Sequence, residues 1–162
     1  MNIIGIDPGT VCCGYGILAV NKKPYVAKYV ASGDIRMSSK KPLPERLHIL
    51  YDSLKDIILE HKPSHLCMEK VFYHKSIRSS MALGTTRGVV MLLAAQHGMP
   101  LFEYNPTEVK MALTGYGRAE KRQVQEMVIR VLNLEPNQIM SEDTSDALAL
   151  TICHINSSFE LK

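Results

Sequence analysis

Four acidic residues are the side chains most suited to chemistry, because each lies at the end of an apolar segment or at the start of a helix. Asp7 follows the apolar run at residues 2–6, and Glu69 ends a second such run. Asp143 and Asp146 are three residues apart, which places them on one helix face. Carboxylates are preferred ligands of Mg²⁺ and Mn²⁺, and two such ions can activate a water and stabilise the leaving oxygen of a phosphodiester. The four acids are therefore candidate catalytic metal ligands.

Each of these acids also has a purely structural interpretation. Asp7 could be a turn residue before Pro8, Glu69 could be a solvated strand end, and Asp143 could favour the positive N-terminus of its helix. Taken singly, the two interpretations are about equally good. Taken together, the four acids favour the functional interpretation, because acids that converge repel each other unless a cation neutralises them.

Apolar periodicity indicates the elements that must position these acids. Strands are expected at residues 2–6, 14–20, 25–37, 64–69 and 100–104, and helices at residues 43–61, 76–97, from Pro106 to a break at 115–117, 120–134 and about 141–157. An opening antiparallel meander followed by βαβ units predicts an α/β protein with a five-stranded mixed sheet flanked by helices, the element order of the RNase H-like fold. Sites collect at the carboxyl ends of parallel strands, so Asp7 and Glu69 should meet.

Composition sets broad limits on the kind of protein. The 162 residues, 46% of them hydrophobic, favour one domain over residues 1–162. The net charge of +3 permits an anionic partner without requiring one. Neither a membrane span of about 20 apolar residues nor a signal peptide is recognisable. The four cysteines have no zinc-binding spacing, so we expect reduced thiols in a cytoplasmic protein.

Six short motifs occur in the order and spacing of a known family. They are Ile4-Gly5-Ile6-Asp7-Pro8-Gly9-Thr10 followed by Gly14-Tyr15-Gly16, Met68-Glu69-Lys70-Val71-Phe72, Leu83-Gly84 with Arg87-Gly88-Val89, Phe102-Glu103-Tyr104, Val109-Lys110 with Gly115 to Lys121, and Asp143-Thr144-Ser145-Asp146-Ala147-Leu148-Ala149. Each motif is weak alone. Together, over about residues 1–154, the chain resembles the RuvC Holliday-junction resolvases.

This resemblance implies a specific activity. Asp7, Glu69, Asp143 and Asp146 would hold Mg²⁺, or Mn²⁺ as a substitute, with two ions in each active site. The protein would be a homodimer that makes two symmetric nicks across a four-way DNA junction during recombination and repair. In bacteria, it would work with the RuvA and RuvB branch-migration proteins.

Two groups of residues are candidate DNA contacts. They are Phe72, Tyr73, Lys75 and Arg78 after the second acid, and Lys110, Arg118 and Lys121 around a glycine-containing loop. Aromatic side chains among cations suit unstacked bases beside phosphates, and basic residues position phosphates without reading sequence. The alternatives are that Phe72 belongs to the core and that the basic residues form a solvated face.

The helix expected at residues 76–97 carries more apolar residues than one stripe can hold, so it should be buried on more than one side. Gly84 and Gly88 are four apart and would let another helix approach closely. With Met81 and Met91 they form a candidate dimer interface around a two-fold axis. The alternative is packing against a neighbouring helix of the same chain.

Three other functions share part of the pattern. An actin-like nucleotide-binding lobe has a similar opening motif, but this chain is short and has no second glycine-rich phosphate loop. A YqgF-like nuclease of the same fold shares the opening but not the segment at residues 68–72. A catalytically inactive junction-binding module would not need the full set of acids.

Overall fold

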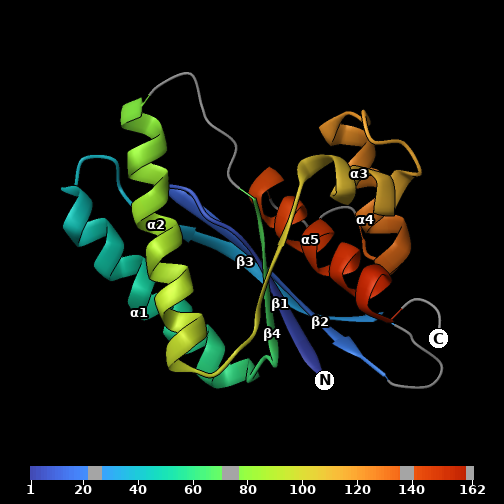
Figure 1. Cartoon of the computed structure of the whole chain (residues 1–162), viewed down its shortest axis with the longest axis horizontal. Coiled ribbons are helices and arrows are strands. Elements are labelled where there is room, and N and C mark those ends of the chain that lie inside the picture. The colour runs from blue at the N-terminus through green and yellow to red at the C-terminus, as the bar shows by residue number, and fades with distance from the viewer. Residues whose placement is uncertain (22–26, 71–76, 136–140, 160–162) are drawn as a thin grey trace.

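Five strands form a single sheet in the computed structural model, which describes residues 1–21, 27–70, 77–135 and 141–159 (Figure 1). The strands are β1 (Asn2–Asp7), β2 (Cys12–Val20), β3 (Ala27–Arg36), β4 (His65–Glu69) and β5 (Leu101–Tyr104). Their order is β3-β2-β1-β4-β5, with β1, β2 and β3 antiparallel and with β4 parallel to both β1 and β5. This confirms the predicted α/β class and the five-stranded mixed sheet.

Helices cover both faces of this sheet (Figure 1). They are α1 (Leu43–His61), α2 (Ile77–Gln96), α3 (Pro106–Thr114), α4 (Lys121–Leu132) and α5 (Glu142–Phe159). The α1 and α2 helices lie on one face, and α3, α4 and α5 lie on the other. The predicted helices are all present, with ends that differ by one or two residues. No helix in the described ranges is long and apolar enough to cross a membrane.

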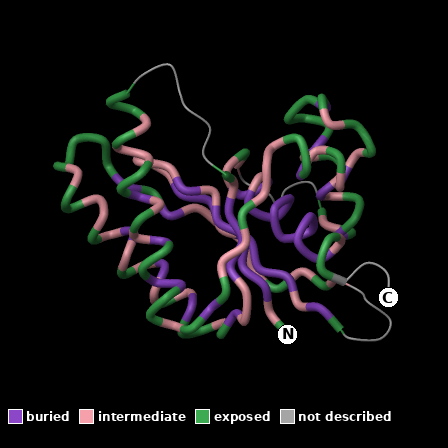
Figure 2. Tube along the Cα trace, in the orientation of Figure 1, coloured by how far each residue is buried: buried purple, intermediate pink, exposed green. Residues whose placement is uncertain are grey.

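Alternation along the strands divides the apolar side chains between two cores. The buried residues lie mainly along the strands and on α5 (Figure 2). On β1, Ile3 packs toward α5, whereas Ile4 and Ile6 pack toward α1 and α2. On β4, Cys67 belongs to the α5 core and Met68 to the other. Because successive side chains point to opposite faces, the next residues, Asp7 and Glu69, face α5.

Glycines let α5 approach the sheet closely. A Cβ atom on Gly5 would lie 2.1 Å from the backbone oxygen of Ala147, and one on Gly14 would lie 2.1 Å from that of Asp143. No side chain fits at either position while α5 stays where it is. These glycines therefore define the height at which the first two turns of α5 rest above β1 and β2.

Candidate active site

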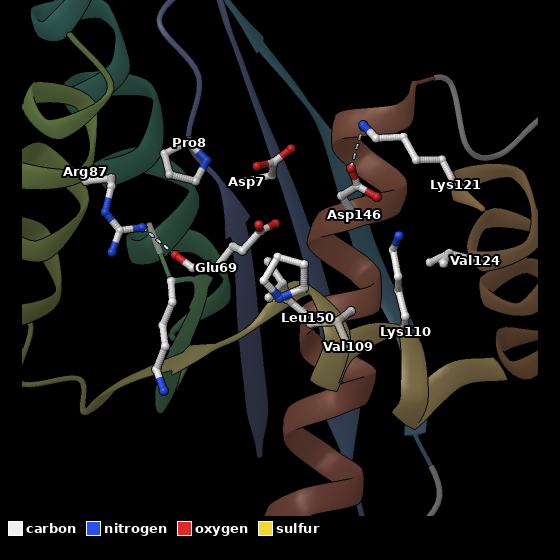
Figure 3. Close-up of a pocket in the computed structure, with 12 residues that line it drawn as sticks. Asp7, Pro8, Glu69, Arg87, Val109, Lys110, Lys121, Val124, Asp146 and Leu150 are labelled. Atoms are coloured by element: carbon white, nitrogen blue, oxygen red, sulfur yellow. Dashed lines mark hydrogen bonds and ion pairs between the residues drawn. The ribbon is translucent and has the colours of Figure 1, made fainter. Parts of the chain in front are cut away.

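Three carboxylates from three elements line one cleft of about 410 Å³ (Figure 3). Asp7 ends β1, Glu69 ends β4, and Asp146 lies on α5. The parallel register pairs Ile6 with Met68, so the residues that follow them lie side by side at the edge of the sheet. The structure thus brings together three of the four acids that the sequence singled out.

The fourth acid, Asp143, lies almost one turn earlier on α5. Its charge is one of those that act on Asp7. Its side chain also hydrogen-bonds the thiol of Cys12. Burial, this hydrogen bond and the nearby charge raise the pKa of that thiol to about 12, so Cys12 is a neutral partner of the carboxylate. Asp143 therefore lies close enough to Asp7 to share one electrostatic environment with it.

Crowding of negative charge is the main electrostatic property of the cleft. Burial, followed by repulsion from Asp146, Asp143 and Glu69, raises the pKa of Asp7 from 3.8 to about 7. Burial also raises the pKa of Asp146, although the adjacent Lys121 opposes that shift. A cation bound among these carboxylates would relieve the repulsion and favour their ionised forms.

The donor set fits a hard divalent cation. Among the residues that the structure describes, no three histidine, cysteine or acidic side chains form a ready-made metal-holding group. Mg²⁺ is usually held by one or two carboxylates together with waters and substrate phosphates, so a complete protein cage is not required. Asp7, Glu69 and Asp146 offer carboxylate oxygens toward one open cleft, which suits that mode of binding.

Basic side chains line the same cleft as the carboxylates. Lys110 from α3 and Lys121 from α4 both line it (Figure 3). The ammonium nitrogen of Lys121 lies 3.3 Å from a carboxylate oxygen of Glu142 and 3.4 Å from one of Asp146. The charge of Asp146 is the largest cause of a raised pKa at Lys121, so this lysine stays protonated. The cleft therefore brings carboxylates and ammonium groups together around one space.

The other predicted DNA contacts lie away from the cleft lining or outside the described ranges. Arg118 is exposed in the segment between α3 and α4. Arg78 is exposed at the start of α2, where it lines a separate hollow with Thr10. Phe72, Tyr73 and Lys75 lie outside the residues that the structure describes.

Arg87 is a residue of this site whose role the sequence did not indicate. From α2, its guanidinium donates one hydrogen bond of 2.5 Å to the backbone carbonyl of Glu69 and pairs with the carboxylate of Glu103. Its side chain is only 11% exposed. Arg87 thus fastens the end of β4, where Glu69 lies, to α2 and β5. It belongs to one of the sequence motifs, but nothing in the motif itself indicates this contact.

The predicted dimer face lies on the outer surface of α2. Met81 is 70% exposed and Met91 is 47% exposed. A Cβ atom added to Gly84 or Gly88 would meet no described atom within 4 Å. These four residues recur at intervals of three and four, so they form one stripe along the helix. Packing of the two glycines against another helix of the same chain is therefore excluded for the described part of the molecule.

Known proteins resemble this chain over nearly its whole length. A family model described as "Crossover junction endodeoxyribonuclease RuvC" matches residues 3–154. A RuvC protein of Pelotomaculum thermopropionicum is 45% identical over 154 residues, covering 95% of this chain and 92% of that protein. One from Desulfitobacterium hafniense is 43% identical over 157 residues, covering 97% and 93%. The solved structure of Thermus thermophilus RuvC in complex with Holliday junction substrate matches with a TM-score of 0.90 at 28% identity, covering 98% and 95%.

Proposed function

Because this chain belongs to the RuvC family of crossover junction endodeoxyribonucleases, we propose that it is a single-domain RNase H-like nuclease that resolves four-way DNA junctions. The observation that carries this proposal is the cleft where Asp7, Glu69 and Asp146 face Lys110 and Lys121. A scissile phosphate needs cations around its oxygens and acidic groups that hold metal ions beside it. The cleft supplies both kinds of group.

Asp7, Glu69, Asp143 and Asp146 are the proposed metal ligands, with Mg²⁺ as the ion and two ions in each site. Bound divalent ions would lower the pKa of an attacking water and stabilise the leaving 3′-oxygen. The chain's own contribution is to hold four carboxylates at the ends of β1, β4 and the start of α5. Lys110 and Lys121 would bind the non-bridging phosphate oxygens and orient the backbone of the cut strand.

Cleavage of a four-armed substrate requires two cuts, and a two-fold dimer supplies two clefts. We propose that the stripe of Met81, Gly84, Gly88 and Met91 forms the homodimer interface. Support comes from its exposed methionines and from the open space above both glycines. Paired, symmetric nicks would then follow from the symmetry of the dimer.

The remaining contacts and partners also belong to the proposal. Phe72, Tyr73, Lys75, Arg78 and Arg118 stay predicted DNA contacts, of which the two arginines have the exposure that such contacts need. RuvA and RuvB remain predicted partners, in the cytoplasm beside chromosomal DNA. The YqgF-like nuclease and the actin-like lobe are not favoured, because the family model that matches residues 3–154 is that of RuvC.

The proposal is tested with Asp7→Asn on a synthetic four-way junction. This change keeps the shape of the side chain but removes the charge, so the variant should bind the junction normally. Its nicking rate in Mg²⁺ should fall by about 10²-fold or more, the scale on which loss of one preorganised active-site group lowers kcat. Asp56→Asn, at an exposed position of α1, is the matched control and should cut like the wild type. Unimpaired nicking by Asp7→Asn would rule out the assigned role.

A further inference from the structure

A fifth carboxylate, Asp34, lies in the same row of the sheet as Asp7. Gly14 of β2 pairs with Asp7 on one side and with Asp34 on the other. Residues in such a row point to the same face of a sheet, and for these three it is the face that α5 covers. Gly14 lies beneath the backbone of Asp143. Asp7 and Asp34 therefore flank the place where the first turn of α5 rests.

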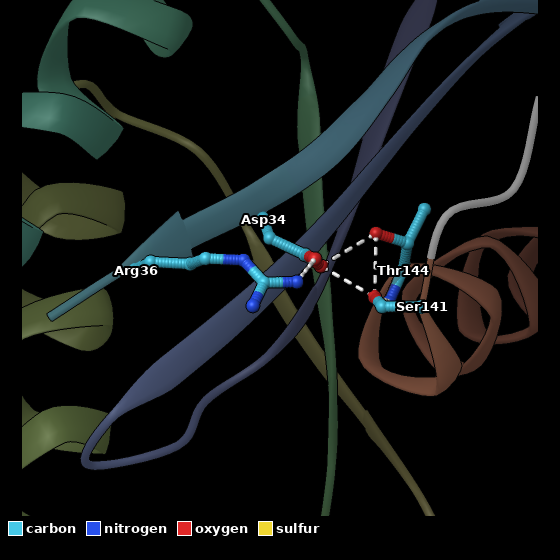
Figure 4. Close-up of polar contacts among 4 residues, drawn as sticks. All are labelled: Asp34, Arg36, Ser141 and Thr144. Carbon is cyan, nitrogen blue, oxygen red and sulfur yellow. Dashed lines mark hydrogen bonds and ion pairs between the residues drawn. The ribbon is translucent and has the colours of Figure 1, made fainter.

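Hydrogen bonds connect Asp34 directly to that first turn (Figure 4). The Ser141 hydroxyl donates to Oδ1 of Asp34 at 2.5 Å, and the Thr144 hydroxyl donates to the same oxygen at 2.7 Å. Ser141 Oγ also accepts a hydrogen bond of 3.0 Å from the backbone N–H of Thr144, which makes it the cap of α5. The two hydroxyls lie on either side of Asp143 in the sequence.

The other oxygen of Asp34 has a different partner. Oδ2 accepts a 3.0 Å bond from the guanidinium of Arg36. The side chain of Asp34 is 8% exposed, whereas that of Arg36 is 74% exposed. Ion pairs with an exposed partner contribute little, so the bonds at Oδ1 are the important ones. With both oxygens engaged in this way, Asp34 is an acceptor for α5 rather than an additional ligand facing the cleft.

We propose that Asp34 is a positioning residue, which uses its bonds to Ser141 and Thr144 to set where α5 places Asp143 and Asp146 relative to Asp7. The inference rests on the proposed nuclease function, because the acids matter only if they act together. The glycines of β1 and β2 set the height of α5 above the sheet. A height alone does not fix the position of the helix along or about its axis. Toward the C-terminal end of α5, the side chains of Thr151 and His154 form hydrogen bonds to Gly16, His65 and Tyr104. At the first turn, the hydrogen bonds from Ser141 and Thr144 to Asp34 are directional and restrict both motions.

Ionisation of Asp34 is maintained by the same contacts. Burial opposes its charge, but the hydrogen bonds from Ser141 and Thr144 and the proximity of Arg36 outweigh burial and hold the pKa of Asp34 below its ordinary value. The acceptor is therefore fully charged under the conditions in which a magnesium nuclease works. A misplacement of catalytic groups by about 1 Å can cost 10²-fold in rate, so a small shift of α5 would be measurable.

Three variants separate positioning from other roles. Asp34→Ala removes the acceptor, and Asp34→Asn keeps Oδ1 as an acceptor while removing the charge. Arg36→Ala removes only the exposed ion pair and is the matched control.

We expect Asp34→Ala to lower the single-turnover rate on a saturating junction by roughly 10-fold or more and to raise the Mg²⁺ concentration at half-maximal rate. Asp34→Asn should restore most of both, and Arg36→Ala should match the wild type. Junction binding should be unchanged in all three.

Two readouts do not require cleavage. Amide hydrogen exchange over residues 141–150 should be faster in Asp34→Ala than in Asp34→Asn. Binding of Mn²⁺, followed by the electron paramagnetic resonance signal of the free ion, should be weaker in Asp34→Ala only. If Asp34→Ala folds poorly, Thr144→Val provides the same test, since it removes one hydroxyl donor at nearly constant volume and should give a smaller loss in the same direction.

The outcomes that overturn the inference are distinct from those that overturn the function. Equal losses in Asp34→Asn and Asp34→Ala would assign the effect to charge instead of position. A lower melting temperature with an unchanged rate, Mg²⁺ midpoint and exchange pattern would reduce Asp34 to a structural residue. A wild-type chain that does not cut junctions would refute the nuclease proposal, while the exchange and Mn²⁺ measurements would still decide whether Asp34 positions α5.

Discussion

Helices α5 and α2 cover opposite faces of one sheet, but they differ in how far their own chain encloses them. The α5 helix buries even polar side chains, among them Thr144, Ser145, Thr151 and His154. The α2 helix leaves Ile77, Met81, Met91 and Leu92 exposed to solvent. The enclosed helix carries the proposed metal ligands Asp143 and Asp146, and the open one carries the stripe that we propose as the dimer interface.

The largest expected effect comes from adding one methyl group at Gly14 of β2, under α5, and comparing it with the same change at Gly88 on the exposed face of α2. Gly14→Ala would place Cβ 2.1 Å from the backbone oxygen of Asp143, so α5 must move outward. We expect a loss of about 3 kcal/mol in the free energy of unfolding, at the upper end for overpacking, and a large fall in cleavage rate. Urea denaturation and junction cleavage measure the two effects.

Gly88→Ala is the matched change on α2, where the new methyl group would meet no described atom of the same chain. Alanine is the better helix former by up to about 1 kcal/mol, so the isolated chain should keep or gain stability. Denaturation at protein concentrations too low for association measures this effect on the stability of the isolated chain alone. If Gly88→Ala there destabilises as much as Gly14→Ala, the two helices do not differ as described.

Part of this arrangement was predictable from sequence. Asp7 and Glu69 could be placed together because each ends a predicted strand, and parallel strands bring their carboxyl ends to the same edge of a sheet. A second apolar side of α2 could be predicted because its apolar residues exceed one stripe and Gly84 and Gly88 repeat at helical spacing. The sequence left open whether that side met a second copy or another helix of the same chain. These features depend on residues that are near each other in the chain or on strands paired side by side.

The contacts of α5 were not predictable in the same way. Asp34 meets Ser141 across 107 positions of sequence, and the meeting depends on the β2–β3 register, which shifts between Ile17 and Leu18. It also depends on how close the glycines let α5 come. Arg87 was visible in a motif, but its bond to the carbonyl of Glu69 involves a backbone atom that no sequence pattern records. Exact placement therefore required the structure.

Protonation of His154 should weaken the packing of α5 against the sheet as the pH falls. Burial, followed by the nearby His65, lowers the pKa of His154 from 6.5 to about 4. The unfolded chain then binds the proton more readily, so this residue's stabilisation is present above pH 6.5 and is lost as the pH falls toward 4. The loss between pH 7 and pH 5 should be about 2 kcal/mol.

The measurement is the free energy of unfolding of the wild type minus that of His154→Gln, followed as a function of pH. This difference is needed because the raised pKa of Asp7 changes the stability of both proteins in the opposite direction over a similar pH range. His154→Gln should flatten the acid side of the curve even if it is less stable at pH 7. Parallel curves for wild type and His154→Gln would contradict the prediction.

The smallest effect on folding should come from the exposed face of α2, although its effect on assembly should be clear. Met81→Glu changes a side chain that is 70% exposed, so the free energy of unfolding of the isolated chain should shift by no more than about 0.5 kcal/mol. In a dimer joined along α2, the same charge would be buried without a partner, which is strongly unfavourable. Light scattering should therefore report a monomer, and junction nicks should become single and uncoordinated.

Leu59→Glu, on the exposed side of α1 at 50% exposure, should leave the dimer intact. A dimer that survives Met81→Glu but not Leu59→Glu would move the interface to α1 and leave the open face of α2 without a role in assembly.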